Sequence, residues 1–259
     1  MRFCSLRSGS SGNAIYIGYK DVHILIDAGL SGKTIEKALM NINVDPSSLS
    51  AILITHEHKD HITGAGILSR RYNIPIYANE LTWDAMENDI KKISEKNKAF
   101  FITGEEFNIG EIKIMPFKKP HDAADPVGFS LKCGDKKFSI ATDLGYMTKG
   151  VANYLIGSDI LLLEANHDVQ MLISGSYPLS LKKRILSDYG HLSNEAAGDA
   201  LVKLFDINSI GMAFLGHLSL NNNRPELAYK TITDILKKSG KKFDIRMALR
   251  DRESELIQI

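Results

Sequence analysis

The chain of 259 residues has few cysteines, little net charge and no long hydrophobic run. Its two cysteines, Cys4 and Cys133, can form no disulfide framework and no Cys-x-x-Cys motif, which indicates a reducing compartment. A formal net charge of +1 creates no overall field toward nucleic acid or membrane, so an anionic substrate would need local charge at a site. No apolar run approaches the roughly 20 residues that span a bilayer, and no signal-peptide segment follows Met1. These absences predict a cytoplasmic protein without membrane association.

The order of hydrophobic patterns predicts an α/β fold in one domain over residues 1–259. Strands come first, helices intervene, and the alternation recurs in the second half of the chain. Such a pattern is typical of a four-layer αββα sandwich, in which two mixed β-sheets are flanked by helices. The predicted strands are 3–6, 14–18, 22–27, 51–54, 74–78, 107–109, 112–117, 127–132, 137–141, 160–164 and 210–215, and the predicted helices are 31–41, 62–72, 80–96, 193–205 and 225–239.

A cluster of histidines follows the apolar run 51–54. His56, His58, Asp60 and His61 lie within six residues, where a predicted strand becomes a helix. A lone histidine is usually structural, but imidazole and carboxylate groups at this density are the ligands of Zn²⁺ and related ions. The cluster therefore predicts a metal site.

Three later residues supply further donors, each after a predicted strand. They are His121, Asp143 and His217. Two ions need more donors than the first cluster offers, and a carboxylate such as that of Asp143 can bridge two ions through its two oxygens. Together the seven residues predict a dinuclear centre of Zn²⁺, Mn²⁺ or Fe²⁺, because nitrogen and oxygen ligands of this kind accept all three.

The order His-x-His-x-Asp-His, then His, Asp and His at strand ends, resembles the signature of the metallo-β-lactamase superfamily. The resemblance implies that His56, His58, His121 and Asp143 hold one metal. It implies that Asp60, His61, Asp143 and His217 hold the second.

Motifs beyond the ligands narrow the resemblance. His191 stands 26 residues before His217 and begins a predicted helix, as an extra active-site histidine does in ribonuclease Z and a cyclic phosphodiesterase of the superfamily. The segments 8–13, 121–123, 141–145, 163–168 and 190–194 are similar to the WalJ (YycJ) family. That family consists of bacterial hydrolases to which 5′ to 3′ DNA exonuclease activity is attributed. The resemblance implies a phosphodiesterase acting on DNA, with Asp60 and His191 as catalytic residues; His191 could donate a proton to the leaving group.

Two further sets of residues are candidate substrate contacts. The turn-rich loop with Ser8, Ser10, Ser11 and Asn13 could offer N–H groups and hydroxyls to a phosphate, or be a plain turn. Lys182 and Arg184 could follow a nucleic-acid backbone, or form a solvated face. A small-molecule hydrolase, acting on a cyclic phosphodiester, thioester or lactone, remains an alternative, and a non-catalytic metal-binding protein is a weaker one.

Overall fold

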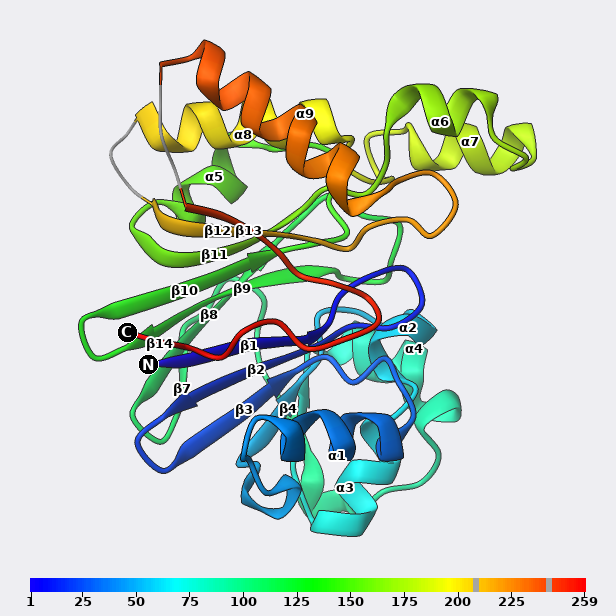
Figure 1. Cartoon of the computed structure of the whole chain (residues 1–259). Helices are drawn as coiled ribbons and strands as arrows, with labels where there is room; N and C mark the ends of the chain where they lie inside the picture. The colour runs from blue at the N-terminus through cyan, green and yellow to red at the C-terminus, as the bar shows by residue number, and fades with distance from the viewer. Residues whose placement is uncertain (207–209, 241–243) are drawn as a thin grey trace.

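Two sheets packed face to face form the centre of the molecule (Figure 1). The computed structural model describes residues 1–206, 210–240 and 244–259. In spatial order the first sheet contains β14 (Ile257–Gln258), β1 (Arg2–Arg7), β2 (Ala14–Tyr19), β3 (Val22–Ile26), β4 (Ala51–Leu53), β5 (Ile76–Ala78) and β6 (Lys98–Phe100). The second contains β13 (Asp244–Met247), β12 (Ile210–Gly216), β11 (Ser158–Glu164), β10 (Lys136–Ala141), β9 (Val127–Cys133), β8 (Ile112–Lys118) and β7 (Phe107–Ile109).

Each sheet is antiparallel in one part and parallel in the other. Strands β3 to β6 pair in parallel, as do β10 to β13, while β1 to β3 and β7 to β10 pair antiparallel. Parallel strands end at a common edge of their sheet, and in open α/β sheets ligands bind at that edge. The topology thus brings the residues that follow β4, β10, β11 and β12 to one end of the sandwich.

Helices cover the outer face of both sheets. On the first sheet these are α1 (Gly32–Asn41), α2 (Lys59–Ile62), α3 (Ala65–Tyr72) and α4 (Glu80–Ile90), with short 3-10 turns at Pro46–Ser48 and Glu95–Asn97. On the side of the second sheet are α5 (Lys149–Leu155), α6 (Val169–Ser174), α7 (Leu179–Ile185), α8 (Asn194–Asp206) and α9 (Pro225–Lys238). None of the helices in the described ranges is long and apolar enough to cross a membrane.

Three apolar cores separate these four layers. The inner core lies between the sheets and contains Phe3, Phe129, Phe138 and Phe214, all buried. One outer core joins the first sheet to α1, α3 and α4, and the other joins the second sheet to α5, α8 and α9. The αββα sandwich of two mixed sheets is therefore confirmed.

Two predicted helices differ from the structure. The helix expected over 62–72 begins earlier, as α2, and breaks at Gly64 before α3, where a side chain at Gly64 would meet the Leu30 carbonyl oxygen. The helix expected over 80–96 ends at Ile90, because Lys91 has a left-handed φ of 60°. The charged sequence after it forms a 3-10 turn and the edge strand β6.

Candidate metal centre

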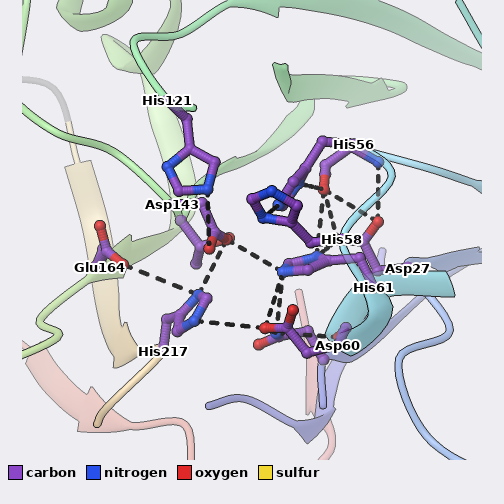
Figure 2. Close-up of polar contacts among 12 residues, drawn as sticks. Asp27, His56, His58, Asp60, His61, His121, Asp143, Glu164 and His217 are labelled. Atoms are coloured by element: carbon purple, nitrogen blue, oxygen red, sulfur yellow. Dashed lines mark hydrogen bonds and ion pairs between the residues drawn. The ribbon is translucent and has the colours of Figure 1, made fainter. Parts of the chain in front are cut away.

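All seven predicted ligands lie at one end of the sandwich, and most of them come within a few residues of the end of a strand (Figure 2). His56 and His58 follow β4, and His58 has an extended backbone at the start of α2. That short helix carries Asp60 and His61, so the chain turns within six residues and presents four donors to one space. The other donors come from the second sheet, where His121, Asp143 and His217 follow β8, β10 and β12.

Asp143 stands between the two groups of ligands. Its Oδ2 lies 2.9 Å from His217 Nδ1 and 3.3 Å from His61 Nε2, while its Oδ1 lies 3.8 Å from His121 Nε2. Each carboxylate oxygen therefore faces a different set of imidazoles. This is the arrangement that a bridging carboxylate requires.

The donor atoms form compact groups within 4.8 Å of one another. One group is His56, His58 and His121, and another is Asp60, His61, Asp143 and His217. The second group has the same members as one set implied by the family resemblance, and the first has the members of the other set without Asp143. A third group replaces Asp60 and His61 by Glu164 and His191, and it shares Asp143 and His217 with the second.

Hydrogen bonds on the outer side orient several imidazoles. Asp27 Oδ2 lies 2.8 Å from His61 Nδ1, and the Gly190 carbonyl lies 3.2 Å from His121 Nδ1. Asp27 is fixed in turn, because the backbone N–H and the hydroxyl of Thr55 both donate to its carboxylate. Partners of this kind select the ring tautomer and leave the opposite nitrogen for a metal.

The charge states of His56, His121 and Asp143 suit cation binding. Burial lowers the pKa of His121 to about 4 and that of His56 well below its usual value, so both rings are neutral, as a ligand must be. Burial opposes ionisation of Asp143, but the neighbouring His217, His61 and Lys119 hold the pKa of its carboxyl well below the usual range. The carboxylate is thus charged when a cation arrives.

An unpartnered nitrogen provides a direct test of fit. His121 Nε2 is buried and has no hydrogen-bond partner among the described residues, although it points at the group formed with His56 and His58. An orphaned buried nitrogen is costly unless something else binds it. A cation between these three imidazoles would satisfy it, so the residues present fit a metal.

Backbone strain also concentrates at this end of the sheets. Asp27, Asp143 and His217 have φ angles of 58°, 53° and 54°, in the left-handed region that side chains other than glycine rarely adopt. Each follows a strand and turns its side chain into the centre. Strained backbone of this kind gathers at functional sites.

Sequence reasoning did not assign a role to Glu164 or Asp27. Glu164 is fully buried at the end of β11, and its carboxylate accepts hydrogen bonds from Leu144 N–H (2.8 Å), Leu192 N–H (3.1 Å) and His191 Nδ1 (2.8 Å). Both residues obey the same strand-end rule that pointed to His121, Asp143 and His217. That rule, applied to every apolar run, is the signal that could have found them.

His191 and His217 occupy different places around Asp143. His217 contacts Asp143 Oδ2, while His191 Nδ1 is bonded to Glu164 and lies 4.0 Å from Asp143 Oδ1. Burial lowers the pKa of His191, but Glu164 and Asp143 outweigh that effect and raise it. Because Nδ1 is bonded to Glu164 and the ring lines the hollow above Asp143, His191 suits the role of a proton donor.

Comparisons with known proteins show the family of the chain. The family model described as "Beta-lactamase superfamily domain" matches residues 23–210. The exodeoxyribonuclease YycJ of Bacillus anthracis is 40% identical over 240 residues, covering 93% of this chain and 90% of the relative. The chain belongs to the β-lactamase superfamily and, within it, to the WalJ/YycJ family.

A second relative and a solved structure are also similar to this chain. The exodeoxyribonuclease WalJ of Streptococcus pneumoniae serotype 2 is 46% identical over 237 residues, covering 91% of this chain and 88% of the relative. Among solved structures, the metallo-β-lactamase fold protein YhfI of Bacillus subtilis superimposes with a TM-score of 0.73 at 17% identity, covering 98% of this chain and 99% of that one. The similarity to YhfI concerns the fold alone.

The predicted substrate contacts lie close to the centre but differ in their surroundings. Ser10 and Arg184 line a hollow of about 340 Å³ that opens on Asp60, Asp143, His191 and His217, and Ser11 is exposed nearby. Ser8 and Asn13 are buried instead: the Ser8 hydroxyl accepts from His217 N–H (2.9 Å), and Asn13 Nδ2 donates to the Asp60 carbonyl (3.3 Å). Lys182 Nζ donates to the carbonyls of Ile173 and Gly175. Contact of these residues with a substrate stays a prediction.

Proposed function

We propose that this protein is a metal-dependent exodeoxyribonuclease that degrades DNA from a 5′ end. The position of Asp143 carries the proposal, because one carboxylate faces two sets of imidazoles and so suits two divalent ions (Zn²⁺, Mn²⁺ or Fe²⁺). Relatives named exodeoxyribonucleases at 40% and 46% identity, aligned over about nine-tenths of both chains, support the choice of DNA.

The proposed ligands are the seven residues of the resemblance. His56, His58, His121 and Asp143 would hold one ion, and Asp60, His61, Asp143 and His217 the other. Bound there, two divalent ions make water a nucleophile near neutral pH and neutralise charge on a phosphodiester.

His191 would supply the proton that the leaving oxygen needs. Its side chain is partly exposed to the hollow above Asp143, and Glu164 favours its protonated form. A phosphodiester oxygen is a poor leaving group unless it is protonated, and a positioned acid contributes about 10²–10⁴-fold to such a step. Arg184 and Lys59 also line the hollow and would face the anionic backbone.

We include a cytoplasmic location in the proposal. Cys4 and Cys133 are both buried and free, which is typical of proteins in a reducing compartment. A small-molecule hydrolase uses the same metals, so the substrate has to be settled by turnover.

The test offers one preparation of the protein several substrates with Mn²⁺ or Zn²⁺. They are DNA labelled at the 5′ or the 3′ end, RNA, bis-p-nitrophenyl phosphate, a chromogenic lactam and a glutathione thioester. We expect early release of the 5′ label as a mononucleotide and retention of the 3′ label until late. Turnover of the lactam or thioester alone would refute the nuclease assignment.

Two variants serve as controls. Asp143→Asn removes the bridging charge and should abolish metal binding and every activity. Lys113→Gln changes an exposed lysine on β8, away from the centre, and should leave metal content and turnover as in the unmodified protein.

A further inference from the structure

A second hollow is lined by Leu218, the residue after the proposed ligand His217. It has a volume of about 600 Å³ and is lined by Leu218, Pro225, Glu226, Tyr229, Met247, Ala248, Leu249, Arg250, Asp251 and Arg252. None of these residues is a proposed ligand. The hollow is large enough for a small organic ligand, and it combines an apolar wall with a few polar groups, as ligand sites commonly do.

Backbone contacts join this hollow to the metal centre. Gly9 forms a parallel bridge with Leu218, and a side chain at Gly9 would meet Arg250 Cβ at 2.9 Å. Ser8 N–H donates to the Leu249 carbonyl (2.9 Å), while the Ser8 hydroxyl bonds the backbone of His217. Figure 1 shows the corresponding approach, where the loop after β1 lies beside the chain between β13 and β14.

Three arginines at this hollow have no side-chain partner within the described part of the chain. Arg250 and Arg252 line it, and Arg224 is exposed directly before the lining residue Pro225. Every other arginine donates to a carboxylate or a carbonyl: Arg2, Arg7, Arg70, Arg71, Arg184 and Arg246. Neighbouring guanidinium groups without a partner are suited to bind a phosphate, because each guanidinium can donate two hydrogen bonds to it.

The remaining lining points to more than a free anion. Tyr229 is 44% exposed and can offer its ring face, and Leu218, Pro225 and Met247 form an apolar wall. Glu226 and Asp251 bring two carboxylates, so the hollow lacks the strong positive charge of a polyanion site. A ligand with a phosphate, a flat ring and amino groups on that ring fits all three features.

We propose that this hollow, defined by Tyr229, Arg250 and Arg252, binds a nucleotide of the DNA strand next to the one at the metal centre. The inference rests on the proposed function and extends it by giving the strand a second point of attachment. An unpaired base stacks on Tyr229, and its phosphate lies between the arginines. Base stacking of this kind tolerates any sequence, whereas a paired base could not reach the ring. Single-stranded DNA, or a frayed end, is therefore the form that the hollow binds.

The test measures binding of a fluorescein-labelled single strand of about 20 nucleotides by anisotropy at several salt concentrations. Each phosphate contact on a single strand contributes about 0.7 to the slope of log affinity against log salt. We expect the double variant Arg250→Gln/Arg252→Gln to reduce the magnitude of that slope by about 0.7, because the two arginines together bind one phosphate. We expect Tyr229→Ala to weaken binding without changing the slope, and Tyr229→Phe to bind as the unmodified protein does.

A matched control removes the same charge elsewhere. Lys113 and Lys132 are exposed partners on β8 and β9, and Lys113→Gln/Lys132→Gln should leave the slope unchanged. Turnover of bis-p-nitrophenyl phosphate, which is too small to span both hollows, should be equal in all variants. The proposal is overturned if both double variants give the same slope, or if the arginine variant loses small-ester turnover as much as DNA binding.

Two possible results distinguish the nucleotide site from the proposed nuclease activity. If the unmodified protein binds a single strand through the two arginines but hydrolyses no DNA, the nucleotide site stands and the nuclease assignment fails. If DNA is hydrolysed and the arginine variant binds it with an unchanged slope, the nuclease assignment stands and the nucleotide site fails.

Discussion

Replacing Glu164 by glutamine tests the proton-donor role proposed for His191. Glutamine keeps the shape of the side chain, and its carbonyl oxygen can still accept from Leu144 N–H and Leu192 N–H, which bond Glu164 Oε2 at 2.8 and 3.1 Å. Its amide group then faces His191 Nδ1, which lies 2.8 Å from Glu164 Oε1. The fold of the loops that carry Asp143 and His191 should survive the change. The negative charge beside the imidazole does not.

The magnitude follows from the one charged hydrogen bond that is lost. Such a bond contributes about 1.5–3 kcal/mol, which corresponds to roughly 10- to 150-fold in rate if it acts fully in the transition state. The sign follows from the pKa shift: burial lowers the pKa of His191, Glu164 raises it, and the substitution leaves burial alone. A general acid must be protonated, so the rate on DNA falls as pH rises through the pKa of His191. The variant should therefore lose activity at a lower pH than the unmodified protein.

The assay is the pH profile of kcat on DNA, with the metal content of each preparation determined by mass spectrometry. We expect the alkaline limb of the profile to move to lower pH and metal content to stay constant. The double variant Glu164→Gln/His191→Ala should be no slower than His191→Ala alone, because the two residues act as one unit. An unchanged alkaline limb, or losses that simply add, would refute the reasoning.

Three other predictions concern metal binding and stability. Asp27→Asn should weaken metal affinity by about 10- to 100-fold, since Asp27 orients His61 at 2.8 Å, and competition with a chromogenic chelator measures it; unchanged affinity would contradict that role. Chelation of the metals should lower the free energy of unfolding by about 2.7 kcal/mol for each bound ion when free metal had stood at 100 times its Kd, and urea titrations with and without chelator test this. Burial lowers the pKa of His167 to about 4. The neutral ring therefore contributes fully to stability above the unfolded pKa of about 6.5, and this contribution is lost as pH falls from there toward about 4. The total loss in the free energy of unfolding is about 3 kcal/mol. His167→Phe removes the titratable ring and should make urea unfolding less sensitive to pH over that range. The change breaks no hydrogen bond among the described residues, because both ring nitrogens lack a partner there. An equal pH sensitivity would count against the buried neutral ring.

Long periodic elements were readable from the sequence, and short edge elements were not. Helix α1 begins after Ser31 as predicted, because the Ser31 hydroxyl accepts from Thr34 N–H and the apolar stripe is regular. Helix α7 buries only Ile185, so its sequence carries no stripe to detect. Strands β13 and β14 have four and two residues, too few to show alternation.

Part of the candidate site was likewise predictable from the sequence, and part was not. Residues 56–61 are dense enough in donors to predict a metal from chemistry alone, and their family order supplied His121, Asp143 and His217. Which atoms meet depends on how two sheets dock, and no local pattern encodes that docking. The strand-end rule marks Glu164 and Asp27 only as candidates, because each is one acidic residue at the end of an apolar run, and the assembled end of the sandwich shows what each one bonds.

The division of the ligands between the two sheets has a consequence for the growing chain. His56, His58, Asp60 and His61 leave the ribosome roughly 150 residues before His217, which corresponds to about ten seconds or more at ordinary rates of synthesis. During that time the nascent protein carries an incomplete set of donors, and the second sheet still lacks β12 and β13. The Ser8 hydroxyl can accept its hydrogen bond from His217 N–H only after His217 has been synthesised. If the seven residues hold two metals, as proposed, loading of both is a late event, open to competition from the cations and chelators that surround the unfinished chain.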